Sequence, residues 1–101
     1  VDRFLPDPGE GPSELQRESG YYKLLFFLSF ADGQKAKVTV TGDRDPGYGS
    51  TSKMLAESAI CLAKDELNDQ FGVITPSTAM GEALLKRLEN HAGLSFKYEE
   101  L

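Results

Sequence analysis

Hydrophobic and polar residues follow two different periods along the chain, and the first of them predicts a β-hairpin. Residues 21–31 are apolar and aromatic almost without a break, which is typical of a strand covered on both faces. The Asp-Gly pair at 32–33 supplies a tight turn, because Gly adopts positive φ at little cost. Residues 35–41 then alternate, which predicts a second strand with one wet face. The apolar members of that alternation are Ala36, Val38 and Val40.

The second period is helical. Residues 51–67 place Leu55, Ala59 and Leu62 on one stripe of a predicted amphipathic helix. Three more apolar residues join this stripe and make the predicted buried face wide: Met54, Ile60 and Ala63. The four apolar residues at 71–74 predict a short buried strand after it.

A second helix should begin at Thr75, a good N-cap, and Pro76, whose missing N–H costs nothing in a first helical turn. It should end at Gly93, which adopts the left-handed conformation readily. Residues 94–99 alternate and predict a last strand. The core-facing stripe of the helix is expected to be Met80, Leu84 and Leu88.

These elements predict an α+β fold in the order ββαβαβ, with two layers: a mixed four-stranded sheet and two helices packed on it. The hairpin at 21–41 should be antiparallel, and the strand–helix–strand unit at 71–99 should be parallel with a right-handed crossover. Residues 1–20 form a linker with a short helical turn capped by Ser13. Residues 21–101 form a single α+β domain. The helices should cover one face of the first strand, and a missing domain or a second copy should cover the other.

Composition narrows the class of protein. The 101 residues carry a net charge of −5, with 11 basic and 16 acidic side chains, so nucleic acid is not an expected partner. No apolar run is long enough for membrane insertion. The lone Cys61 and the absence of a visible signal sequence favour a reducing, cytoplasmic location. With one Cys and one His, no metal site is expected. The start at Val1 fits a chain cut from a larger protein.

A glycine-rich loop that leads into the first long helix is the candidate binding site. Helix N-termini have unpaired N–H groups and attract anions. Glycines would let a ligand approach the backbone, hydroxyls and a lysine would add contacts, and the competing interpretation is a helix cap with a tight turn. The candidate residues for a substrate or cofactor cleft are Arg44, Gly47, Tyr48, Gly49, Ser50, Thr51, Ser52 and Lys53.

The remaining chemical groups predict no catalysis of their own. His91 falls in the last turn of a predicted helix and has no evident acid–base partner. Cys61 lies in mid-helix with no basic neighbour along the chain to lower its pKa, so a buried structural thiol is expected. The aromatic residues of the first strand indicate core or interface. The catalytic residues therefore stay unknown.

Three blocks of sequence together carry a family resemblance. They are residues 8–13 (Pro-Gly-Glu-Gly-Pro-Ser), residues 45–59, which begin Asp-Pro-Gly-Tyr-Gly-Ser, and residues 72–81, which begin Gly-Val-Ile-Thr-Pro. In this order and spacing the chain resembles the C-terminal region of saccharopine dehydrogenase-like oxidoreductases. The likeness is to the branch that contains the mycobacterial trans-acting enoyl reductases and the saccharopine dehydrogenase-like oxidoreductases of animals.

This resemblance implies a much longer parent polypeptide. Its N-terminal Rossmann domain would bind NAD or NADP, and the present chain would belong to the substrate and dimerisation region. The expected partners are that Rossmann domain and a second copy that pairs through the sheet. The fragment itself should hold no cofactor and should not be active in isolation. In the parent, the loop at 44–53 would face the cleft between domains.

A second class of function stays open at this point. Small two-layer α+β sheets also serve as free-standing ligand-binding or regulatory modules, since fold does not determine function. A purely structural or adaptor role for the domain is a third hypothesis. The substrate and the choice between NAD and NADP lie outside what these residues specify.

Overall fold

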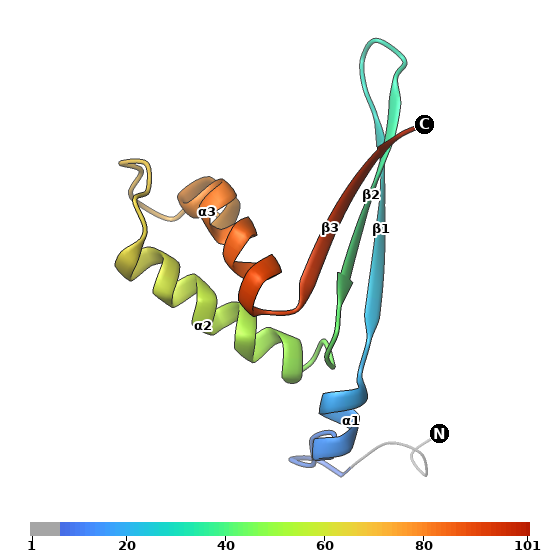
Figure 1. The fold of residues 1–101 in the computed structure, drawn as a ribbon, viewed down its shortest axis with the longest axis vertical. Helices are drawn as coiled ribbons and strands as arrows, with labels where there is room; N and C mark the ends of the chain where they lie inside the picture. Colours follow the sequence, from blue (N-terminus) through green and yellow to red (C-terminus); the bar gives the residue numbers. More distant parts are fainter. Residues whose placement is uncertain (1–6) are drawn as a thin grey trace.

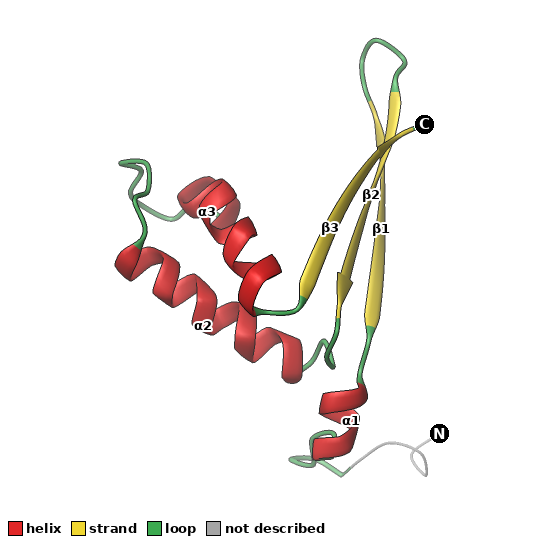
Figure 2. Cartoon of the chain, viewed as in Figure 1, coloured by secondary structure: helices red, strands yellow, loops and turns green. Residues whose placement is uncertain are grey.

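The computed structural model describes residues 7–101 of the chain, so residues 1–6 of the predicted linker lie outside the described residues. Two helices follow a hairpin, and a final strand returns to the sheet (Figures 1 and 2). In chain order the elements are α1 (Glu14–Ser19), β1 (Tyr22–Ser29), β2 (Lys35–Gly42), α2 (Gly49–Lys64), α3 (Pro76–His91) and β3 (Leu94–Glu100).

The three strands form one antiparallel sheet in the order β1-β2-β3. The predicted hairpin is confirmed, and Gly33 sits in its turn with φ +86°. The predicted last strand is confirmed as β3, which pairs with β2 so that Val38 lies between Phe26 and Tyr98. Ala36, Val38 and Val40 share one face of β2, as their alternation predicts.

The mixed four-stranded sheet is wrong, because residues 71–74 form no strand. Phe71 is 86% exposed, and Gly72 turns the chain with φ +118°. The helices α2 and α3 form a hairpin, and the loop that joins them lies at the end far from the sheet (Figure 1). A strand at 71–74 would therefore have no neighbour to pair with, and no parallel crossover forms.

The helices also pack on each other rather than on the sheet, which corrects the predicted two-layer arrangement. Only Leu94 and Phe96, at the start of β3, join the helical core. Beyond that junction the sheet and the helices diverge (Figure 2). The buried residues of the core are Cys61, Met80, Leu84, Leu88, Ala92 and Leu94.

The predicted stripe of α3 is confirmed, whereas the predicted face of α2 is right only in part. Leu55 and Leu62 are 71% and 61% exposed. Met54 of the predicted face packs against the core, together with Cys61, which was not assigned to that face. Both stripes are apolar at helical spacing, so the local pattern allows either of them to be the buried one. The side of α2 that faces α3 is the one that also carries Glu57, which forms an ion pair with Arg87 of α3.

The predicted ends of α3 are confirmed. The hydroxyl of Thr75 accepts a hydrogen bond from the Thr78 N–H, with Pro76 in the first turn. At the other end Gly93 has φ +70°. Within the helix the backbone of Gly81, at φ +46° and ψ −128°, interrupts the helical path, a conformation that Gly tolerates and that side-chain-bearing residues disfavour.

The chain is extended for its length. Its radius of gyration is 16.8 Å, against about 13 Å for a compact domain of this size. Its accessible surface is 7913 Å², roughly 2,000 Å² more than a compact chain of the same mass would expose. No helix in the described part of the chain combines the length and apolar character that crossing a bilayer requires.

Candidate functional site

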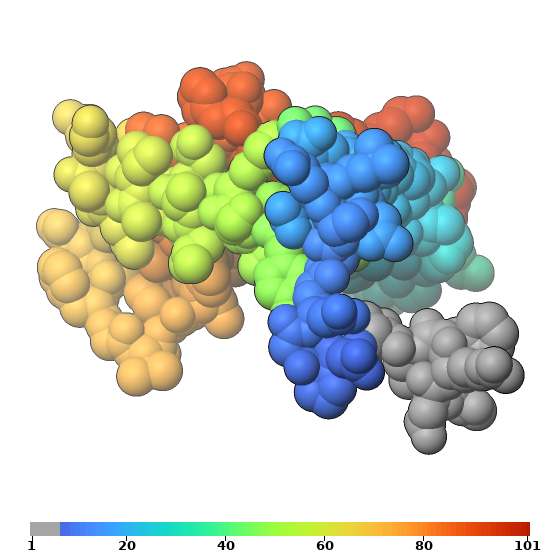
Figure 3. All heavy atoms as spheres, turned by 90° about the horizontal axis from the view of Figure 1, so that it is seen from below, coloured from blue at the N-terminus to red at the C-terminus, as the bar shows by residue number. Residues whose placement is uncertain are grey.

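The predicted loop site lies where α2 begins, beside α1 and the base of the sheet (Figure 3). Asp45 organises it. One oxygen of its carboxylate accepts hydrogen bonds from the N–H groups of Tyr48 (2.7 Å) and Gly49 (3.1 Å). These bonds, that from Tyr48 foremost, hold the pKa of Asp45 below its ordinary value. The negative charge at the positive end of the helix is stabilising.

The hydroxyls of the loop form hydrogen bonds within the protein, although only that of Ser50 is buried. Ser50 is fully buried, and its Oγ lies 2.8 Å from the Tyr22 hydroxyl of β1. Thr51 donates to the Pro46 carbonyl at 2.6 Å, and Ser52 donates to the Gly49 carbonyl at 3.0 Å. Each hydroxyl therefore already has a partner that fixes the loop.

The other predicted residues lie on the rim of this loop. Arg44 is half-buried, with its guanidinium 3.8 Å from Glu18 of α1. Tyr48 is 61% exposed and borders a hollow of about 310 Å³. The hollow is shared with Gly9, Gly11, Pro12 and Arg17.

Gly47 and Gly49 have different roles in this loop. Gly47 is exposed, whereas a side chain on Gly49 would come within 3.0 Å of the Arg17 carbonyl. Lys53 is half-buried and forms no ion pair within residues 7–101.

The eight predicted residues thus gather at one place, and their role as a cleft wall stays a prediction. The role of Asp45 as the residue that caps the helix was not predicted from the sequence. The sequence feature that could have indicated this role is the Asp-Pro-Gly run at 45–47. In such a run the Asp carboxylate can accept hydrogen bonds from the N–H groups three and four residues later in the chain. A carboxylate already bound at this helix start leaves little room for a second anion.

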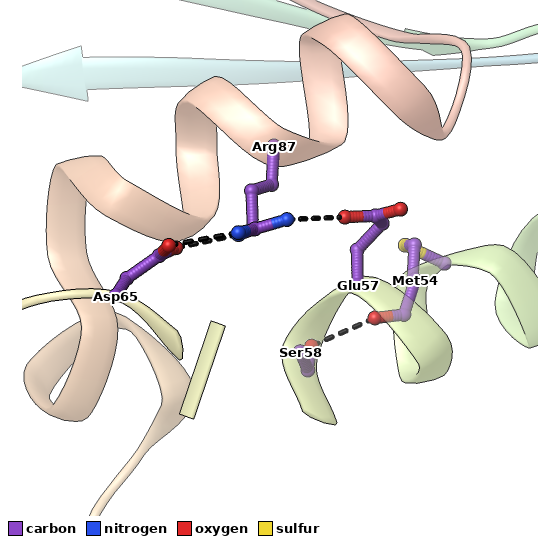
Figure 4. A network of polar contacts seen from close by, with 5 residues as sticks. All are labelled: Met54, Glu57, Ser58, Asp65 and Arg87. Carbon is purple, nitrogen blue, oxygen red and sulfur yellow. Dashed lines mark hydrogen bonds and ion pairs between the residues drawn. The ribbon is translucent and has the colours of Figure 1, made fainter. Parts of the chain in front are cut away.

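A polar cluster joins α2 to α3 on the other side of the core (Figure 4). The guanidinium of Arg87 forms a two-point pair with the Asp65 carboxylate, with Nη2 2.7 Å from Oδ1. Its Nη1 lies 3.2 Å from Glu57. The Arg87 hydrogen bonds lower the pKa of Asp65 to about 2 and the two carboxylates raise that of Arg87. Because two carboxylates surround one cation, the cluster carries no spare positive charge for an anionic substrate.

Cys61 and His91 do not form a reactive pair. Cys61 is fully buried, as expected, and burial followed by the Asp65 carboxylate raises the pKa of its thiol. Arg87 of α3 is a basic neighbour that the sequence analysis missed, and its opposing effect on the thiol is smaller. His91 is exposed at the end of α3. In the part of the chain that the structure describes, no three His, Cys, Asp or Glu side chains gather in a way that could hold a metal ion.

The sheet exposes apolar side chains to solvent on one of its faces. One face of the sheet, here called the open face, carries apolar side chains from all three strands, in register with each other. Phe26 at its centre remains 50% exposed, and Tyr98 remains 55% exposed. The opposite face is polar on β2 and β3, where Lys37 pairs with Glu99 at 2.9 Å. Phe96 lies on the same face at its foot, where it packs against the helical core. The residues of the open face are Leu24, Phe26, Leu28, Val38, Val40 and Tyr98.

An apolar surface of this kind binds another apolar surface. Neither face of β1 is covered within residues 7–101, since Leu25 and Phe27 on the opposite face are 49% and 71% exposed. By contrast, no acid–base pair or nucleophile with an activating base is assembled among the described residues. The fold and the site therefore define the class: an α+β domain with a three-stranded antiparallel sheet that leaves apolar side chains exposed among the described residues.

Comparison with known proteins finds relatives that are far longer than this chain. A Mycobacterium tuberculosis protein provisionally named a trans-acting enoyl reductase is 43% identical to the chain over 103 aligned positions, which cover all of this chain and 24% of that protein. A trans-acting enoyl reductase of Mycobacterium ulcerans is 40% identical over 90 residues, covering 87% of this chain and 21% of its own length. The chain thus spans about a quarter of the length of these curated relatives. No protein-family model and no solved structure matches it.

Proposed function

We propose that this chain is one domain of a NAD(P)-dependent oxidoreductase of the trans-acting enoyl reductase kind, with a saccharopine dehydrogenase-like architecture. The observation that carries the proposal is the pairing of two facts. The chain is similar over its whole length to a segment of one far longer relative, and over 87% of its length to a segment of another. It also exposes an apolar sheet face that a longer polypeptide would cover.

In this proposal the domain acts as scaffold and docking surface, in the cytoplasm, and it is inactive in isolation. The open face packs against the remainder of the reductase, which includes a Rossmann domain. The loop at 44–53 and the exposed ring of Tyr48 border the cleft between the two parts. Docking also accounts for the apolar residues of the α2–α3 loop, of which Phe71 is 86% exposed.

The start of α2 does not fit the pyrophosphate of a nicotinamide dinucleotide. The pyrophosphate of such a cofactor binds N–H groups at a helix start. At the start of α2 the Asp45 carboxylate already accepts from the N–H groups of Tyr48 and Gly49, and its charge would repel a phosphate. In this proposal the nucleotide binds to the other part of the reductase.

Reconstitution tests the proposal. The M. tuberculosis relative is produced without its matching segment, mixed with this chain, and assayed for oxidation of NADH or NADPH with a short 2-enoyl thioester. Each part alone should be inactive, and the mixture should consume nicotinamide. Tyr98→Asp on the open face should abolish the recovery, and Lys97→Asp on the opposite face should leave it. A truncated relative that is fully active alone, or a mixture that stays inactive, would overturn the proposal.

A further inference from the structure

The outer edge of β1 has no strand beside it among residues 7–101. The N–H of Phe30 donates to the Gln34 carbonyl at 2.9 Å, so this end of the hairpin is a hydrogen-bonded pair. In an antiparallel ladder such pairs recur at every second residue, so the even-numbered residues of β1 bond to β2. The N–H and C=O groups that point outward therefore belong to Lys23, Leu25, Phe27 and Ser29.

The two edge strands of the sheet differ in composition. The seven residues of β3 include three charged side chains, two of which, Lys97 and Glu99, form an ion pair at 3.4 Å. Charged side chains are among the features that keep an edge strand from pairing further. By contrast, the eight residues of β1 include one charged side chain, Lys23, and no Pro, and the strand pairs with β2 in one continuous register. Only β3 therefore has the composition of a strand that ends a sheet.

The face of the sheet opposite the open face shows from which side a cover approaches. On β2 and β3 this face is polar, with Lys37 beside Glu99 and Thr39 on the next level. On β1 it carries Leu25 and Phe27, which are both exposed. Since strands that are apolar on both faces are typically covered on both, and charged side chains resist burial, the cover for these two residues lies over β1 and beyond its outer edge.

We propose, on the basis of the proposed function, that β1 is an interior strand of a larger sheet and that the remainder of the reductase supplies the next strand. The relatives extend far beyond the segment that this chain matches. A strand from the same polypeptide pairs at a higher effective concentration than a second copy does, which favours it as the occupant. The incoming strand binds the outward backbone groups of β1 and is apolar on both faces, to match the side chains that β1 presents on each.

Hydrogen exchange of the backbone amides tests the pairing. The isotopically labelled chain is mixed with the M. tuberculosis relative that lacks its matching segment, and exchange is followed by NMR. The outward amides of β1 should exchange at least about tenfold more slowly in the complex, since they gain hydrogen-bond partners. The outward amides of β3, which belong to its even-numbered residues, should exchange as in the free chain. Binding without slower exchange at β1 would overturn the edge pairing alone, whereas no binding would overturn the reductase proposal with it.

A proline at each edge separates the backbone contact from the side chains. Leu25→Pro removes an outward N–H and no bond to β2, so it should raise the dissociation constant for the remainder of the relative by about tenfold, because a partner carbonyl loses its donor. Leu25→Ala keeps the N–H and should weaken binding less. Glu100→Pro makes the same change on the outer edge of β3 and should bind like the wild type. Equal affinities for the two proline variants would overturn the proposal. So would slower exchange at β1 in the chain alone that strengthens with its concentration, because a second copy would then occupy the edge.

Discussion

The side chains of Arg87 and Asp65 form a two-point ion pair that ties α3 to the end of α2, with Nη2 2.7 Å from Oδ1. The α2 helix ends at Lys64, earlier than the sequence pattern predicts, and Asp65 takes an extended conformation there. This places its carboxylate against the guanidinium. The pair thus fixes both where α2 stops and how closely α3 packs on it.

Removal of the guanidinium should destabilise the chain. In Arg87→Met the carboxylates of Asp65 and Glu57 lose their shared partner and are left half-buried, so the Tm should fall by several degrees. Lys86→Met is the matched control, since Lys86 is exposed and forms no ion pair within residues 7–101. Thermal denaturation followed by circular dichroism gives the comparison. Equal Tm values for the two variants would show that the Arg87 ion pairs do not stabilise the fold.

Acid should weaken the fold over a defined pH window. The pKa of Asp65 is lowered to about 2 and that of Asp45 is also lowered, the first by Arg87 and the second by backbone N–H groups. A depressed pKa means that the unfolded chain binds protons first as the pH falls. The stabilisation is complete above about pH 4, the unfolded value, and is lost toward pH 2. Urea denaturation across that range should show the decline, and Asp65→Asn should flatten it. A wild-type curve that is flat between pH 4 and 2 would contradict both shifts.

The contact between Tyr22 and Ser50 should hold the base of the sheet to α2. Tyr22→Phe leaves the fully buried Ser50 hydroxyl without its 2.8 Å partner, so the free energy of unfolding should fall by about 1–2 kcal/mol. Tyr21→Phe, on the exposed neighbour, should change it by less than about 0.5 kcal/mol. Adding Ser50→Ala to Tyr22→Phe should recover part of the loss, because no hydroxyl is then unpaired. Denaturant titration of the four proteins measures each value.

Local chemistry made some of the fold predictable. The hairpin turn at Gly33, the N-cap Thr75 and the stop at Gly93 each depend on the backbone preferences of one or two residues. The capping box at Ser13, where Gln16 and Ser13 bond reciprocally, belongs to the same group and confirms the predicted short helix. Features of this kind need no knowledge of the rest of the chain.

Features that depend on distant partners were not predictable. The apolar run at 71–74 resembles a strand, but strand formation needs a neighbouring edge, and the helical hairpin carries this run away from the sheet. The pair between Arg87 and Asp65 spans 22 positions of sequence, with no local pattern to mark it. For the candidate site, the glycines and hydroxyls of the loop predicted a helix start, while the inward bonds of Ser50 depend on Tyr22 from another element.

Calorimetric titration of the chain with the remainder of the M. tuberculosis relative tests most directly whether the open face is a docking surface. The wild-type chain should bind with a negative heat-capacity change, the mark of buried apolar surface. Val38→Asp, at the centre of the open face, should weaken binding by about tenfold or more. Thr39→Asp, the next residue on the opposite face, should bind like the wild type. Equal affinities for the two variants, or no binding by the wild-type chain, would contradict the account.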